Sequence, residues 1–128
     1  MKNLPPCIIL EVGYCILLSS KLIYSGDANK AGTYYLSSGC SFGNYKLACF
    51  FAYTSAAGFS SFLGMPGENM LITHTKVDSS YKQTTYQVKV AISKSNTFSL
   101  SNGAYGRTSM SEYGEFYAWY IAKIYGIN

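Results

Sequence analysis

The chain has 128 residues, of which 12% are charged and 16% are aromatic, and its formal net charge is +4. This length suits one core, so we treat residues 1–128 as a single domain. Nucleic-acid binders usually gather Lys and Arg on one face, whereas here the basic residues are scattered and Arg107 is the only arginine. We therefore expect no nucleic-acid partner; a cluster built by strands would most easily unite Lys82, Lys89 and Lys94.

The composition favours strands and turns over helices. Thirteen residues are Tyr, and Ser, Thr, Gly and Asn fill much of the remainder. Strong helix formers are scarce. Tyr combines an apolar ring with a polar hydroxyl, so the same composition is typical of recognition surfaces.

Residues 1–20 form an N-terminal strand or extension in this interpretation. Residues 7–18 are apolar, and we predict a buried strand or strand pair there. Pro5, Pro6 and Glu11 interrupt what would otherwise resemble a secretory signal, although a cleaved signal remains the alternative. The apolar run is also shorter than the ~20 residues that a membrane span needs, so we expect no membrane insertion.

The cysteines lack the CxxC spacing of a zinc site, and three of the four lie in apolar runs. Cysteine in such runs behaves as a small buried hydrophobic residue. We therefore favour buried free thiols over disulfides for Cys7, Cys15, Cys40 and Cys49.

The first half of the chain alternates apolar runs with turn signals. Residues 7–24 are rich in β-branched and aromatic side chains, and residues 25–32 read as a turn. A short strand is predicted at 33–38 and a second turn at 39–44. Residues 45–54 are apolar on both faces in the middle, which predicts a central buried strand.

Residues 55–69 are rich in Gly and contain one Pro, which predicts a long loop. Phe59, Phe62 and Met65 lie within it. They either cap one end of the core or form an exposed contact loop, because binding residues concentrate on loops.

The second half contains the clearest strand pattern. Residues 70–77 alternate, and residues 86–93 place apolar and polar side chains on opposite faces, as in a strand with one wet face. Another strand is predicted at 97–101, followed by a polar loop at 102–115 that opens with an Asn-Gly turn signal. The apolar segment 116–128 must be a paired strand in the core or part of a subunit interface.

About seven to nine strands separated by turn signals predict an all-β fold. The expected architecture is an antiparallel β-sandwich, jelly-roll-like in its arrangement.

No pattern of catalytic or metal-binding residues is evident. His74 is the only histidine, and Glu68 and Asp78 are the acids nearest to it in sequence. Glu112 and Glu115 lie three residues apart, but solvated loop carboxylates explain them better than a glycosidase pair. We therefore expect a non-enzymatic protein without metal or cofactor.

The order of segments resembles a β-domain of bacteriophage tail and tail-fibre proteins. The matching elements are SGDANKAGTYYLSS, then SFGNYKLACFFAY, then the Pro-bearing GMPGEN, and finally YIAKIYGIN. The resemblance covers residues 21–128, and residues 1–20 do not match it.

The resemblance implies a viral protein on the exterior of a phage tail or capsid, made in the bacterial host cytoplasm. Domains of this kind are structural or receptor-binding parts of the virion and are commonly homotrimers that contact other virion proteins. It supplies no catalytic residues. The implied ligand is a host-surface receptor or glycan.

Candidate ligand-binding residues follow from the chemistry of sugar sites, which combine aromatic faces with hydrogen-bonding groups. They are Tyr105, Arg107 and Tyr113 in the predicted polar loop, with Trp119 either joining them or belonging to the core. Two alternatives stay open. One is a purely structural assembly protein (a capsid decoration, head fibre or tail adaptor), and the other is a secreted lectin-like protein of a cell.

Overall fold

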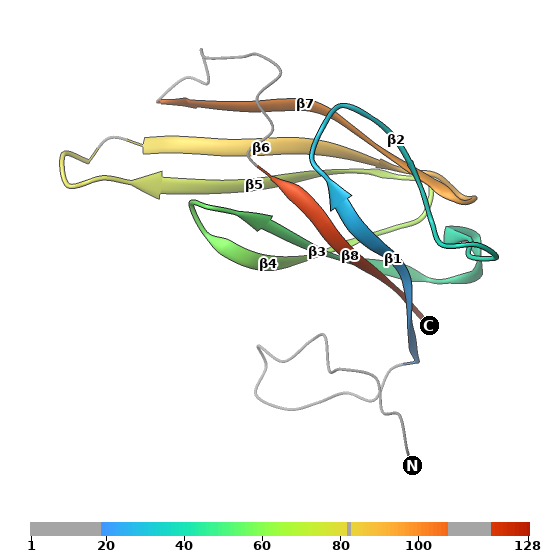
Figure 1. The fold of residues 1–128 in the computed structure, drawn as a ribbon. Coiled ribbons are helices and arrows are strands. Elements are labelled where there is room, and N and C mark those ends of the chain that lie inside the picture. Colours follow the sequence, from blue (N-terminus) through green and yellow to red (C-terminus); the bar gives the residue numbers. More distant parts are fainter. Residues whose placement is uncertain (1–18, 82, 108–118) are drawn as a thin grey trace.

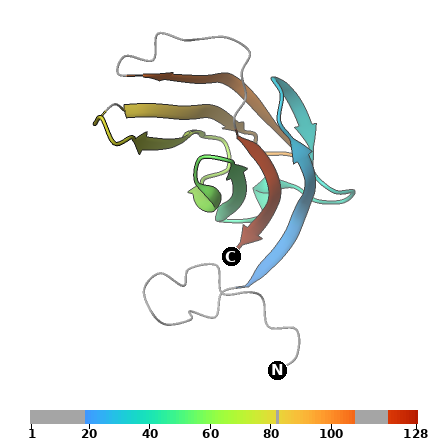
Figure 2. The ribbon, with the colours of Figure 1, turned by 60° about the vertical axis from the view of Figure 1, so that its left-hand side comes forward.

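The computed structural model describes residues 19–81, 83–107 and 119–128. These residues form eight strands in two four-stranded antiparallel sheets that lie face to face (Figures 1 and 2). The predicted all-β sandwich is confirmed, with a strand number inside the expected range. Within the same ranges, no helix is long and apolar enough to cross a membrane.

Each sheet contains strands from both halves of the chain. Sheet A has the order β1 (Ser20–Ala28), β8 (Tyr120–Ile127), β3 (Leu47–Thr54) and β4 (Gly58–Gly64). Sheet B has the order β2 (Gly32–Tyr35), β7 (Thr97–Arg107), β6 (Gln83–Ile92) and β5 (Asn69–Val77). A short 3₁₀ helix, Phe42–Asn44, precedes β3.

The pairing of the first strand with the last and of the second with the seventh gives the sandwich its jelly-roll-like winding. The four strands between them form two hairpins, β3–β4 and β5–β6. Strand β8 lies between β1 and β3, and Ile121 and Ile124 are fully buried. The apolar C-terminal segment therefore contains a paired core strand, which was the first of the two alternatives predicted for it.

The core fills the space between the sheets. Val88, Val90 and Ile92 of β6 are buried at every second position, as their alternation predicted. Phe50 of sheet A meets Phe98 of sheet B edge to face, with ring centroids 5.9 Å apart. Burial of each such side chain stabilises the fold by about 1.5–3 kcal/mol.

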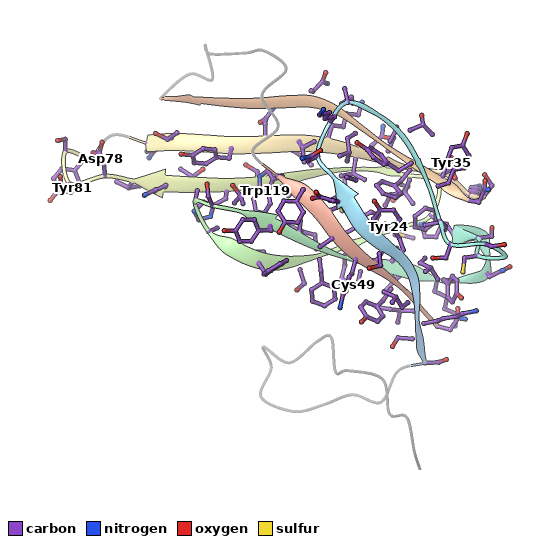
Figure 3. All side chains as sticks on the ribbon, in the orientation of Figure 1. Tyr24, Tyr35, Cys49, Asp78, Tyr81 and Trp119 are labelled. Atoms are coloured by element: carbon purple, nitrogen blue, oxygen red, sulfur yellow. The ribbon has the colours of Figure 1, made fainter. Side chains whose placement is uncertain are left out.

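The β5–β6 hairpin extends beyond the ends of β3 and β4 (Figure 1). Asp78 and Tyr81 lie at its tip (Figure 3), and Tyr81 is 88% exposed. The Asp78 carboxylate accepts a 2.8 Å hydrogen bond from the backbone N–H of Ser80, which helps to form the turn.

The prediction of a long loop at 55–69 was wrong, because residues Gly58–Gly64 form β4 and pair with β3 along its length. Gly58 turns the chain with a φ of +76°. Gly64 lies where the two sheets approach closely, since a Cβ there would be 2.5 Å from Cδ1 of Ile92. These glycines therefore shape a hairpin and do not mark irregular structure.

Two predicted turn segments also belong to strands. Strand β1 continues to Ala28, and its register against β8 shifts between Ser25 and Ala28. Strand β7 continues through Asn102-Gly103, which form a β-bulge opposite Val88, with Asn102 at a φ of +52°. The left-handed backbone that Asn adopts at low cost serves a bulge here and not a turn.

The predicted strand or strand pair at 7–18, with Cys7 and Cys15, lies outside the described residues. Cys40 is a buried free thiol, as expected, and Cys49 is also buried. Cys49 lies in β3 on the side of sheet A that faces away from sheet B, in register with Tyr125 and Leu63 (Figure 3).

Candidate functional site

The two outer faces of the sandwich differ in chemistry. The outer face of sheet B is mainly polar, although Leu71 is 54% exposed beside Lys89. Its central polar positions are Thr73, Thr75, Thr85, Gln87, Lys89, Ser99 and Ser101. The outer face of sheet A carries aromatic side chains on three adjacent strands. Because exposed aromatic clusters mark binding surfaces more often than polar faces do, sheet A holds the candidate site.

One row of this face consists of three rings that the strand register places side by side. Tyr53 pairs with Phe59 on one side and with Tyr120 on the other. The ring of Tyr53 lies 5.0 Å from that of Phe59 and 5.2 Å from that of Tyr120, between centroids. Cross-strand ring pairs of this kind hold each other in place.

The next row contains Lys123, the charged residue of the site. Lys123 of β8 pairs with Phe51 of β3, and Phe51 pairs with Ser61 of β4. The ring of Phe51 also meets Tyr125 nearly edge to face, at 5.6 Å and 78°. The Lys123 position is thus flanked by an aromatic pair on one side and by the three-ring row on the other.

Two adjoining depressions open between these side chains. The first, of about 290 Å³, is lined by Phe51, Phe59, Ala122, Lys123 and Tyr125. The second, of about 400 Å³, shares both phenylalanines and adds Ser60 and Ser61. Together they form one shallow groove, the aromatic groove, with ring faces and one ammonium at one end and the outward-facing Ser61 with the adjacent Ser60 at the other.

The rings of the groove remain accessible to a ligand. Phe59 is 64% exposed, and Phe51, Tyr53, Tyr120 and Tyr125 are half-buried. Each half-buried ring rests on its neighbours and has few rotamers to lose on binding, so the surface is preorganised.

A β-bulge brings the residues of β8 to this face. Ala52 pairs with Ile121 and Phe51 with Lys123, so Ala122 is an additional residue in β8. As a result Tyr120, Lys123 and Tyr125 share the outer face although their spacing is three and then two residues.

Sequence reasoning named only Phe59 of this site, because it predicted a buried central strand at 45–54 and placed the C-terminal segment either in the core or in a subunit interface. The alternation of Phe51 and Tyr53 with Phe50 and Ala52 was an available signal for β3. In β8 the bulge interrupts the period of two, so no simple pattern identified its outward residues.

The three residues predicted as a contact loop are divided by the structure. Phe59 is exposed on the outer face of sheet A and lines the groove. Phe62 is half-buried and packs against the core, as a core cap would. Met65, just after β4, is 52% exposed but does not line the groove.

Trp119 is placed in the core. Its side chain is only 1% exposed, it meets Phe62 edge to face at 5.6 Å, and its Nε1 donates a hydrogen bond to Tyr86 (Figure 3). A buried indole with its donor occupied is a packing residue, so Trp119 does not belong with the ligand-binding candidates.

The predicted polar loop at 102–115 is wrong for 102–107, which belong to β7, and its remaining residues lie outside the described ranges. Tyr105 and Arg107 lie within that strand, in register with Tyr86 and Thr84. Tyr113 lies outside the described residues, as do Glu112 and Glu115.

The two acidic residues nearest to His74 in sequence do not gather around it in the structure. His74 is half-buried in β5, and Glu68 and Asp78 lie just beyond opposite ends of that nine-residue strand. At about 3.4 Å per residue, the strand keeps the backbones of these two acids far apart. Among the described residues, no group of His, Cys, Asp and Glu side chains is positioned to hold a metal ion.

The groove therefore offers stacking surfaces, hydroxyl groups and one cation, which are the elements of a binding site. No protein-family model, curated protein or solved structure matches the chain. The function is therefore inferred from the residues of the groove and from the order of segments in the sequence.

Proposed function

We propose that the chain is a non-enzymatic module of a phage virion that binds a host-surface glycan through the aromatic groove of sheet A. The observation that carries the glycan proposal is the exposed ring of Phe59 beside Phe51 and Tyr125, on a sheet that holds them rigidly. Sugar rings present flat C–H faces that pack on such aromatic surfaces, and their hydroxyls need polar partners at the edge.

The serine end of the groove supplies those polar partners. Ser60 and Ser61 line the depression beside the two phenylalanines. The Ser61 side chain shares the outer face with Phe51 and Phe59, whereas Ser60 pairs with the buried Ala52 and can offer its backbone. The Ser61 hydroxyl can donate one hydrogen bond and accept others, as the hydroxyls of a saccharide require. Two adjoining depressions that share Phe51 and Phe59 and have polar groups beyond them suit an extended ligand of at least two sugar units.

The phage assignment is supported by the order of sequence segments described above, from the Gly-bearing turn at 25–32 to the YIAKIYGIN ending. A small β-sandwich with a recognition face is compatible with a tail-fibre or tail-tip component. An antibody against the chain should label the tail or capsid exterior of particles that carry its gene. Particles without the chain would contradict this part of the proposal.

A second candidate is an interface between copies of the chain, with a trimer as the expected assembly. Leu22 and Leu63 lie in register with Tyr125 and Cys49 on the same outer face, and they are 41% and 50% exposed. Exposed leucines beside the groove are typical of a subunit interface. This candidate corresponds to the purely structural virion role.

The glycan proposal is tested with a glycan array and the variant Phe59→Ala. Because the Phe59 ring is 64% exposed, its removal should leave stability nearly unchanged and weaken glycan binding at least tenfold. Tyr35→Ala is the matched control, since Tyr35 is an equally exposed aromatic residue (66%) on β2 of the other sheet.

Sedimentation of the same proteins separates the two candidates. A parent protein that binds no glycan and forms an oligomer that Phe59→Ala dissociates would replace the glycan proposal with the interface. Equal glycan binding by the parent and Phe59→Ala would remove the groove as the binding site.

A further inference from the structure

Resting on the proposed function, we infer that the aromatic groove selects a negatively charged sugar and that Lys123 binds its anionic group. Three features of Lys123 support this inference: its position, the absence of a carboxylate partner among the described residues, and the apolar surroundings of its side chain.

Lys123 stands at the centre of the outer face of sheet A. It pairs with Ser25 on β1 and with Phe51 on β3, and its side chain is exposed. It lines the same depression as Phe51, Phe59 and Tyr125. An ammonium in this place can reach a substituent of any sugar ring that packs on the phenylalanines.

No carboxylate of the described strands neutralises this charge. Asp27 is the only acidic residue in the four strands of sheet A, and it forms no ion pair with Lys123. A positive charge without a carboxylate partner among the described residues, in a chain with ten basic and six acidic residues, attracts anions to the groove.

The side chains around Lys123 increase the preference of the groove for a negatively charged sugar. Phe51, Phe59 and Ala122 present hydrocarbon to the depression, so a bound sugar displaces water from beside the ammonium. A charge pair with less water around it is stronger than one in bulk solvent. Of the described residues that line the two depressions, Lys123 alone carries a charge, so its removal should weaken the binding of an acidic ligand most.

The test compares acidic and neutral glycans on one array. Each carboxylated glycan, with polygalacturonate as the first, is printed beside its methyl ester, which keeps the sugar rings and removes the charge. Neutral and sulfated glycans complete the set. The proteins are the parent, Lys123→Gln and Lys89→Gln; the last is the control, because it lowers net charge equally on the outer face of sheet B.

The expected result is binding to acidic glycans that Lys123→Gln weakens about tenfold, as the loss of one charge-assisted hydrogen bond does. Lys89→Gln should retain full binding, the methyl esters should bind the parent and Lys123→Gln equally, and added salt should weaken only the acidic binding.

Two other results overturn the inference in distinguishable ways. Binding to neutral glycans alone, or equal losses in Lys123→Gln and Lys89→Gln, removes the preference for negative charge and leaves the glycan site standing. Binding to no glycan at all removes both the inference and the proposed function.

Discussion

The indole Nε1 of Trp119 donates a 3.2 Å hydrogen bond to the backbone carbonyl oxygen of Tyr86, joining the start of β8 in sheet A to β6 in sheet B. Trp119→Phe removes this donor and leaves a gap beside Phe62. We expect the free energy of unfolding to fall by about 2–4 kcal/mol, measured by urea denaturation with an unchanged m-value. Tyr120→Phe, one residue later on the outer face, should change it by about 0.5 kcal/mol at most. Equal stability of the two variants would show that the indole link is dispensable.

The ring of Tyr45 covers Gly126 so closely that a Cβ at Gly126 would lie 2.5 Å from two of its carbons. Gly126→Ala should therefore displace the ring and lower the free energy of unfolding by about 1–3 kcal/mol. The double variant Tyr45→Ala/Gly126→Ala removes the clash, so its loss should be smaller than the sum of the single losses. Strictly additive losses in thermal or urea unfolding would refute the contact.

Thr54 is fully buried at the end of β3, and its Oγ1 has no hydrogen-bond partner within the described part of the chain. Thr54→Val keeps the shape and removes the hydroxyl, so it should raise the free energy of unfolding by about 1 kcal/mol. Thr54→Ser keeps the hydroxyl and loses a methyl group, and should lower it by about 1 kcal/mol. If both variants lower stability, the hydroxyl has a role that its surroundings do not indicate.

Burial raises the pKa of the Tyr24 hydroxyl above its usual value, and the nearby Tyr34 raises it further. A raised folded-state pKa means that this contribution to stability is complete below the unfolded pKa of about 10 and is lost as pH rises through the folded value. The urea midpoint should therefore decrease as the pH rises above about 10, and should decrease less steeply in Tyr24→Phe.

Tyr35→Phe provides the comparison for the alkaline experiment, because Tyr35 is 66% exposed. It should follow the pH profile of the parent protein. A Tyr24→Phe profile that coincides with that of Tyr35→Phe would exclude Tyr24 as a source of the alkaline loss.

The strands that sequence predicted best are those with an undisturbed period of two. In β6, Val88 and Val90 alternate with Gln87 and Lys89, and the structure keeps that division between core and solvent. In β3, the segment predicted as a central strand does lie between two partners. Local patterns sufficed here because each side chain faces the direction that its position in the strand requires.

The parts that sequence did not predict depend on pairing between distant segments. Ala122 disrupts the alternation of β8, and Asn102-Gly103 continues β7 where an isolated Asn-Gly reads as a turn. Gly64 suits a strand only because Ile92 of the other sheet approaches it. The aromatic groove is assembled from β3, β4 and β8, so none of these three segments reveals it alone.

The place of β8 between β1 and β3 also fixes when the protein can fold. The ribosome makes β8 after every other described strand, so β1 has no partner among the described strands of sheet A until Ile127 has left the exit tunnel. The hairpins β3–β4 and β5–β6 can form earlier, because their contacts are local. Completion of sheet A must therefore wait for β8, and until then the apolar edge of β3 that pairs with β8 is exposed to aggregation or to pairing with β8 of a neighbouring nascent chain.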